Sequence, residues 1–182
     1  RHKLHQSIDM KKKPDSFRRL SETVYSAKGP VVWISRSEID FLQDVAAKSS
    51  SRKARVLLHG SSDEDLHEML IVHSFGQYIQ PHINLDSAKS FVVLDGEMAV
   101  VLFNHEGAIS KHFQLGPSNG TADFFLRLED PVFHTIVPIS TTVTFLETVK
   151  GPHMQTHYAP FAPPPNDMLA SGKYMTWLME EL

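Results

Sequence analysis

Six short apolar runs, separated by turn-rich segments, fill the middle of the chain. They lie at residues 55–59, 69–75, 91–94, 98–103, 134–138 and 143–149. The segments between them, such as 60–63 and 116–120, are rich in glycine, serine, asparagine, aspartate and proline, which are typical of the loops that join strands. Many short strands at close spacing predict an all-β sandwich or barrel.

Two of these runs, 91–94 and 98–103, are apolar on both of their alternating faces. Because residues two apart on a strand share a face, Val101 and Phe103 lie on one side and Val100 lies on the other. Such strands must be covered on both sides. One cover is the opposite sheet, and the second is an N-terminal helix, the C-terminal segment or a second copy of the chain. We therefore expect a homodimer.

Helical patterns flank the β region. Ser35 and Glu38 have the spacing of a capping box, and the apolar residues that follow at helical spacing predict a helix over 37–48. Near the C-terminus, the prolines of 160–165 predict an extended strap, because proline cannot pair inside a central strand. Ser171 is in position to cap a final helix.

These patterns divide the chain into four parts. They are a basic N-terminal tail and lead-in (1–34), a helix and linker (35–53), a barrel (54–150), and a proline-rich strap with a C-terminal helix (151–182). The first thirteen residues carry five Lys or Arg against one Asp, an excess of four positive charges. Without apolar periodicity, this tail is either an arm that contacts nucleic acid or phosphate, or a solvated terminus.

Composition narrows the class of protein. With 41% hydrophobic and 21% charged residues, the chain is typical of a globular domain rather than a disordered segment. The net charge of −3 gives no general attraction to nucleic acid, and no stretch approaches the ~20 apolar residues of a membrane span. We expect neither as a partner. The absence of cysteine excludes disulfide scaffolds and thiolate metal sites, and we expect a cytoplasmic location.

Residues 76–96 contain the most informative spacing, which reads G-x5-H-x-N-x4-K-x6-G. His82 and Asn84 are two apart, so they share one face of a strand. A short hairpin after them brings Lys89 opposite. A histidine from a distant strand that faces the same interior, such as His134, completes a four-residue pocket of the kind that holds Zn, Mn, Fe or Ni.

This frame resembles the first motif of the cupin superfamily, G-x5-H-x-H-x3/4-E-x6-G, whose second motif adds one more histidine. The amino-acid sequence from residue 55 to residue 165 is similar to the WbuC-like branch of cupins, a branch associated with bacterial polysaccharide gene clusters. The matching segments are ARVLLH (54–59), PH (81–82), SFVVLDGE (90–97), VLF (101–103), HT (134–135), ET (147–148), GP (151–152) and FAP (161–163). The resemblance implies a double-stranded β-helix, the cupin jelly-roll barrel, with short N- and C-terminal helices.

The chain departs from the cupin motif at two of its four ligand positions. Asn84 replaces a histidine and Lys89 replaces a glutamate, so only His82 and His134 carry over as metal ligands. Asparagine is a weak neutral ligand, and a lysine must lose its proton before it can ligate. At an effective dielectric near 20, two unit charges 4 Å apart interact by about 4 kcal/mol, and a divalent ion doubles this repulsion. We predict that tight metal binding is lost or severely weakened. No cofactor is expected, and any that binds is a divalent metal.

Three interpretations of this pocket stay open. Lys89 can replace the missing cation and bind a carboxylate or phosphate of a small polar ligand. It can instead extend out of the barrel mouth and leave a relic pocket, or a metal site can survive. Glu147 is able to replace the lost acidic ligand or to pair with Lys89. Arg55 and His59 either reach the pocket or anchor the junction between helix and barrel.

Three functions follow from these interpretations. The first is a cupin-fold protein that binds a small polar or anionic molecule, such as a sugar-related or carboxylate compound. The second is a metal-dependent isomerase or dioxygenase in which His82 and His134 hold the metal as a Lewis acid. The third is a dimerisation or interaction module. An enzyme and a noncatalytic protein both stay open, because a barrel scaffold hosts many chemistries.

Overall fold

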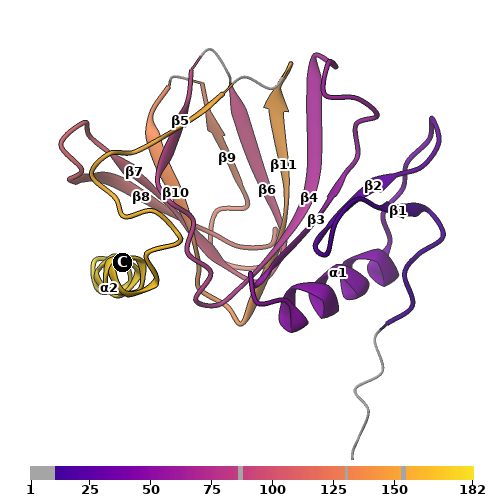
Figure 1. Ribbon diagram of the computed structural model, residues 1–182, viewed down its shortest axis with the longest axis horizontal. Coiled ribbons are helices and arrows are strands. Elements are labelled where there is room, and N and C mark those ends of the chain that lie inside the picture. The colour runs from indigo at the N-terminus through magenta and orange to yellow at the C-terminus, as the bar shows by residue number, and fades with distance from the viewer. Residues whose placement is uncertain (1–10, 86–87, 130, 153–154) are drawn as a thin grey trace, which may run out of the picture.

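Two sheets face each other as the walls of a barrel in the computed structural model (Figure 1), which describes residues 11–85, 88–129, 131–152 and 155–182. The larger sheet has seven strands in the spatial order β1-β2-β3-β4-β11-β6-β9. Their bounds are β1 Phe17–Arg19, β2 Val24–Ala27, β3 Lys53–Leu57, β4 Leu66–Ser74, β11 Thr142–Lys150, β6 Lys89–Asp95 and β9 Phe125–Leu128.

The smaller sheet has five strands in the order β12-β5-β10-β7-β8. Their bounds are β12 Thr156–Tyr158, β5 His82–Asn84, β10 Phe133–Pro138, β7 Met98–Phe103 and β8 Ile109–Leu115. From β4 onward, every connection except the one between β7 and β8 passes from one sheet to the other. This alternation is the double-stranded β-helix, so the predicted all-β jelly-roll barrel with short N- and C-terminal helices is confirmed.

Both outer faces of the barrel are covered by helices (Figure 1). Helix α1, Arg36–Lys48, packs Phe41 and Leu42 against the outer side of β3 and β4. Helix α2, Met168–Glu180, packs Leu178 against the outer side of β7 and β10. The two-sided apolar pattern of β7 is thereby satisfied within one chain, because its inward residues join the barrel core and its outward residues lie under α2.

The predicted start of the first helix is confirmed and that of the last helix is wrong. Ser35 caps α1 with the complete capping box that includes Glu38. Helix α2 begins at Met168, where the Asp167 carboxylate accepts a hydrogen bond from the Ala170 backbone N–H (3.0 Å). Ser171 lies one turn inside the helix and is buried. The Asp167 carboxylate, two residues after the last proline, lies before Ser171 in the chain and caps the helix at this earlier position.

Strand pairing extends the β region beyond the apolar runs. The strand expected at 55–59 spans Lys53–Leu57, and the run at 69–75 is the end of the nine-residue β4. The lead-in contains the β1–β2 hairpin, and β2 pairs with β3 as the only parallel pair among the described strands. Of the basic tail, residues 1–10 lie outside the described residues. Neither described helix has the length and apolarity to cross a membrane.

Candidate functional site

A pair of histidines lies on adjacent strands of the smaller sheet. His82 on β5 is directly opposite His134 on β10, and their ring centroids are 4.5 Å apart. The Nδ1 atom of His82 lies 3.1 Å from the Gln80 carbonyl, and that of His134 lies 2.9 Å from the Val132 carbonyl. A carbonyl oxygen only accepts, so Nδ1 of each ring is the donor. In the neutral rings both Nε2 atoms are therefore hydrogen-bond acceptors.

Burial keeps these two rings neutral. Loss of solvent, followed by the charge of Lys89, lowers the pKa of His82 to about 4. The same causes in the same order, with His82 as a third, place the pKa of His134 well below its ordinary value. Both imidazoles thus carry a lone pair at neutral pH.

Asn84 stands beside the histidine pair, two residues along β5 from His82. Its side-chain Nδ2 donates to the Thr156 hydroxyl on β12 at 3.3 Å. Its Oδ1 is buried and has no hydrogen-bond partner among the described residues. A buried acceptor without a donor costs about 1–3 kcal/mol, so this atom is suited to a donor supplied by a ligand.

Lys89 begins β6 in the opposite sheet and extends into the barrel. Its side chain is 5% exposed, and its Nζ lies 6.0 Å from the centroid of the Phe91 ring. No hydrogen bond or ion pair within 4 Å joins this amine to another described residue. Burial lowers the pKa of Lys89, and the negative charge of Glu147 partly opposes this effect. The structure thus places the amine inside the cavity rather than in bulk solvent.

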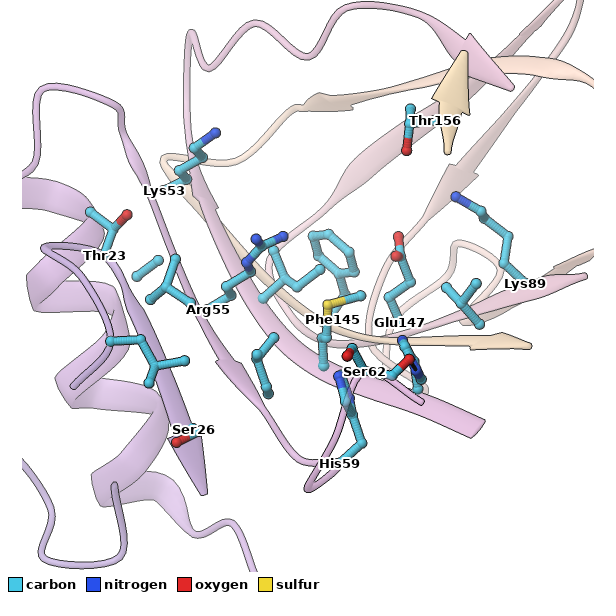
Figure 2. Close-up of a pocket in the computed structure, with 18 of the residues that line it drawn as sticks. Thr23, Ser26, Lys53, Arg55, His59, Ser62, Lys89, Phe145, Glu147 and Thr156 are labelled. Atoms are coloured by element: carbon cyan, nitrogen blue, oxygen red, sulfur yellow. Dashed lines mark hydrogen bonds between the residues drawn. The ribbon is translucent and has the colours of Figure 1, made fainter. Parts of the chain in front are cut away.

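Glu147 on β11 is the only carboxylate that lines the cavity among the described residues. It lies opposite Phe91 in register, diagonal to Lys89, and is half-buried. Figure 2 shows Glu147 and Lys89 extending into the same space from neighbouring strands. The two interact electrostatically, although the described residues include no direct ion pair between them. Glu147 is therefore available to a ligand.

The cavity has a volume of about 680 Å³, and its mouth is basic. Arg55 on β3 is exposed there, in the same sheet as Lys89 and with two strands between them (Figure 2). Two further cations that the sequence did not single out, Arg18 and Lys53, lie on the same rim. The spacing in the sequence could have indicated Lys53, because it stands two residues before Arg55 and so lies on the same face of the strand. Arg18 arrives through the N-terminal hairpin, and no local pattern in the sequence predicts that pairing.

His59 lies at the edge of this cavity and is held by the backbone. Its Nδ1 accepts from the Glu68 backbone N–H at 3.2 Å, and its ring stacks on His67 with centroids 4.2 Å apart. These contacts fasten the loop between β3 and β4. The structure thus gives His59 an anchoring contact in addition to its place in the lining.

His73 on β4 is a buried member of the cavity lining. Its Nδ1 has no hydrogen-bond partner among the described residues, and its ring meets Phe145 edge-on at 5.4 Å. Burial, together with the charges of Lys53 and Arg55, lowers the pKa of His73 to about 3. Two positive side chains of the cavity wall, Lys53 and Arg55, thus add to the effect of burial on this ring.

The donor set at the cupin metal position does not fit a tightly held divalent cation. Two imidazole nitrogens and the free Asn84 oxygen converge there, but the fourth position holds the Lys89 amine instead of a carboxylate. No group of three or more His, Cys, Asp or Glu suited to a metal occurs within the described ranges. Protonated, Lys89 repels a divalent ion by several kcal/mol.

The chain is similar to one family model and to several solved structures. A family model described as a domain of unknown function (DUF6016) matches residues 34–115, just under half of the chain. No curated protein matches the sequence. Similar solved structures include procruciferin, an 11S globulin from Brassica napus (16% identity, 52% of this chain, 22% of that chain, TM-score 0.43). Others are an oxalate oxidase (11%, 74%, 74%, 0.48) and the oxalate decarboxylase of Bacillus subtilis (16%, 52%, 24%, 0.42).

This chain spans less than a quarter of the length of the globulin and of the decarboxylase. At these identities and TM-scores, the likenesses concern the general course of the chain and say nothing of its ligand. From its own strand order, the chain has the cupin-type jelly-roll barrel.

Proposed function

We propose that the barrel binds a small organic anion, and that Arg55 at the mouth of the cavity holds the acidic group of this ligand. The observation that carries this proposal is the charge of the cavity lining. Its described residues include four cations, Arg18, Lys53, Arg55 and Lys89, and one carboxylate, Glu147, which gives +3 (four minus one). The whole chain has the opposite charge, −3.

Among the described residues, Glu147 is the single carboxylate that lines the cavity with these cations. The pKa of Lys53 is lowered by burial and then by the neighbouring Arg55 charge. Within the described part of the chain, no ion pair within 4 Å joins Lys53, Arg55 or Lys89 to a carboxylate. Like charges gathered in a cleft raise the local concentration of an anion. A bound carboxylate relieves their mutual repulsion, by about 1 kcal/mol for each cation at 4 Å in a water-like dielectric and about four times this at the partly buried sites.

The size and lining of the cavity indicate an organic ligand rather than a bare ion. Its volume of about 680 Å³ lies in the usual range for small-molecule sites, roughly 300–1,000 Å³. Ile71 and Phe145 form part of an apolar floor, and Asn84 and the neutral His82 supply acceptors. The resemblance of residues 55–165 to the WbuC-like branch of cupins supports a sugar-related acid as one member of this ligand class.

Thermal unfolding with paired probes tests the proposal. Pyruvate and D-glucuronate are compared with their uncharged counterparts, pyruvamide and D-glucose, at constant ionic strength. The anions should raise the Tm and the neutral compounds should not, since ligand binding to the native state alone stabilises it. Arg55→Gln should reduce the shift. The control is Arg127→Gln, because Arg127 is exposed on β9 and faces Glu129 at 3.5 Å, away from the cavity. Equal shifts with neutral probes contradict anion recognition.

The adjacent rings of His82 and His134, whose Nε2 atoms carry the lone pairs, favour one second candidate, a metal-dependent enzyme. Metal analysis of purified protein separates the two. The anion-binding proposal predicts well under one metal per chain in the unaltered protein. It also predicts a gain in metal when Asn84→His is combined with Lys89→Glu, because the pair restores two ligands and removes the repelling amine. Stoichiometric metal in the unaltered protein supports the enzyme instead.

A further inference from the structure

The amine of Lys89 has the surroundings of a nucleophile rather than of a structural cation. It is 95% buried, it faces a cavity large enough for an organic ligand, and no described carboxylate lies within ion-pair distance of it. Structural lysines in protein interiors are normally paired. A lysine left unpaired in an apolar pocket loses its proton readily, and the free amine attacks carbonyl carbon.

The neighbours of Lys89 supply what such an attack requires. Glu147 shares the cavity, on the strand next to β6, and can take and return a proton. Arg55, on β3 of the same sheet, lines the same cavity and can hold an acidic group of a ligand whose carbonyl lies toward Lys89 (Figure 2). With Lys89 uncharged, the lining still carries +2, three cations minus one carboxylate.

We infer that Lys89 forms an imine with a 2-oxo acid in this cavity. The Nζ lone pair adds to the carbonyl carbon of the 2-oxo acid, and Glu147 carries one proton from the nitrogen to the carbonyl oxygen to give a carbinolamine. Glu147 then takes the remaining proton from the nitrogen and passes it to the departing hydroxyl, so one water leaves and the neutral nitrogen is left double-bonded to carbon. No oxidant or reductant enters this step. The inference rests on the proposed function, since Arg55 must recognise the carboxylate of the ligand.

Reductive trapping on the full chain tests the inference. The protein is incubated with pyruvate and cyanoborohydride, and the modified peptide is located by mass spectrometry. We expect a mass gain equal to pyruvic acid less one oxygen atom, on Lys89. Lys89→Arg should abolish the adduct and keep the cation. Lys111→Arg is the matched control, since Lys111 is exposed on β8 and does not line the cavity, and it should leave the adduct unchanged. Mapping the adduct on the unaltered protein decides the site even if Lys89→Arg fails to fold.

Two further arms separate this inference from the proposed function. Pyruvate binding is measured by calorimetry without reductant, and trapping is repeated with the uncharged aldehyde propanal. Binding of pyruvate without an adduct on Lys89 overturns the imine and leaves anion binding intact. An adduct spread over surface lysines also overturns the imine. Labelling of Lys89 by propanal, with neither binding nor labelling by pyruvate, overturns both the 2-oxo acid assignment and the proposed function.

Discussion

The buried ring of His73 gives the barrel a built-in sensitivity to acid. Its pKa of about 3 lies far below the ordinary value of 6.5, first because of burial and then because of Lys53 and Arg55. In the unfolded chain the ring takes up a proton near pH 6.5, whereas the folded protein does so only near pH 3. The unfolded state therefore binds more protons in this window, and stability falls as the pH is lowered through it.

The size of this effect follows from the two pKa values. Each pKa unit corresponds to about 1.4 kcal/mol. Between pH 7.5 and pH 5.0, about 1.5 pH units lie below 6.5, where the ring is protonated in the unfolded chain but not in the folded protein. His73 should therefore contribute a loss of about 2 kcal/mol in the free energy of unfolding over this interval. His73→Leu removes the titrating ring and keeps a side chain of similar size. The stability of this variant should fall by about 2 kcal/mol less than that of the unaltered protein over the same interval.

Urea unfolding at pH 7.5 and pH 5.0 measures this difference. Phe145→Leu is the control, because it removes the partner of the edge-on ring contact without removing a proton site. Its cost should be nearly the same at both pH values. A His73→Leu variant that loses as much stability as the unaltered protein between pH 7.5 and 5.0 would refute the reasoning, since His73 would then titrate like an exposed imidazole.

Three further predictions concern the cavity potential, the covering helix and a turn. Lys53→Gln should raise the pKa of His73, read from its NMR titration, because Lys53 is the largest charge acting on that ring; an unchanged or lower value contradicts the electrostatic account. Leu178→Ala should lower the free energy of unfolding by about 2–5 kcal/mol in urea titrations, because Leu178 of α2 is fully buried against β7 and β10. Gly96→Ala should cost more than 1 kcal/mol by the same assay, because Gly96 has φ +73° and an added Cβ would collide with the Thr142 carbonyl; a neutral effect contradicts that contact.

Much of the barrel could be predicted because its signals are local. Alternating apolar runs identify the central strands, and the Ser35–Glu38 pattern identifies the start of α1. The short strands β5, β9 and β12 have three or four residues each, and they exist through pairing with distant strands. The predicted cap of the last helix, Ser171, was wrong because the apolar pattern of that helix does not fix its first turn, which Asp167 caps.

The candidate site, too, could be predicted where its residues are close in the sequence, and not where strand pairing brings them together. The spacing within 76–96 placed His82 and Asn84 together on β5, but the predicted hairpin to Lys89 is wrong, because β5 and β6 lie in different sheets. The rest of the lining depends on the register between β3 and β4. Lys53 pairs directly with His73 in that register, and neither residue stands out in the sequence. The cationic lining therefore became visible only once β3 and β4 were aligned.

Anomalous diffraction from crystals soaked in bromide tests the central claim most directly, because it shows which sign of charge the cavity attracts. The account predicts a bromide peak inside the cavity, within hydrogen-bonding distance of Arg55 or Lys89. A metal ion held between the Nε2 atoms of His82 and His134, with the cavity free of bromide, would contradict it.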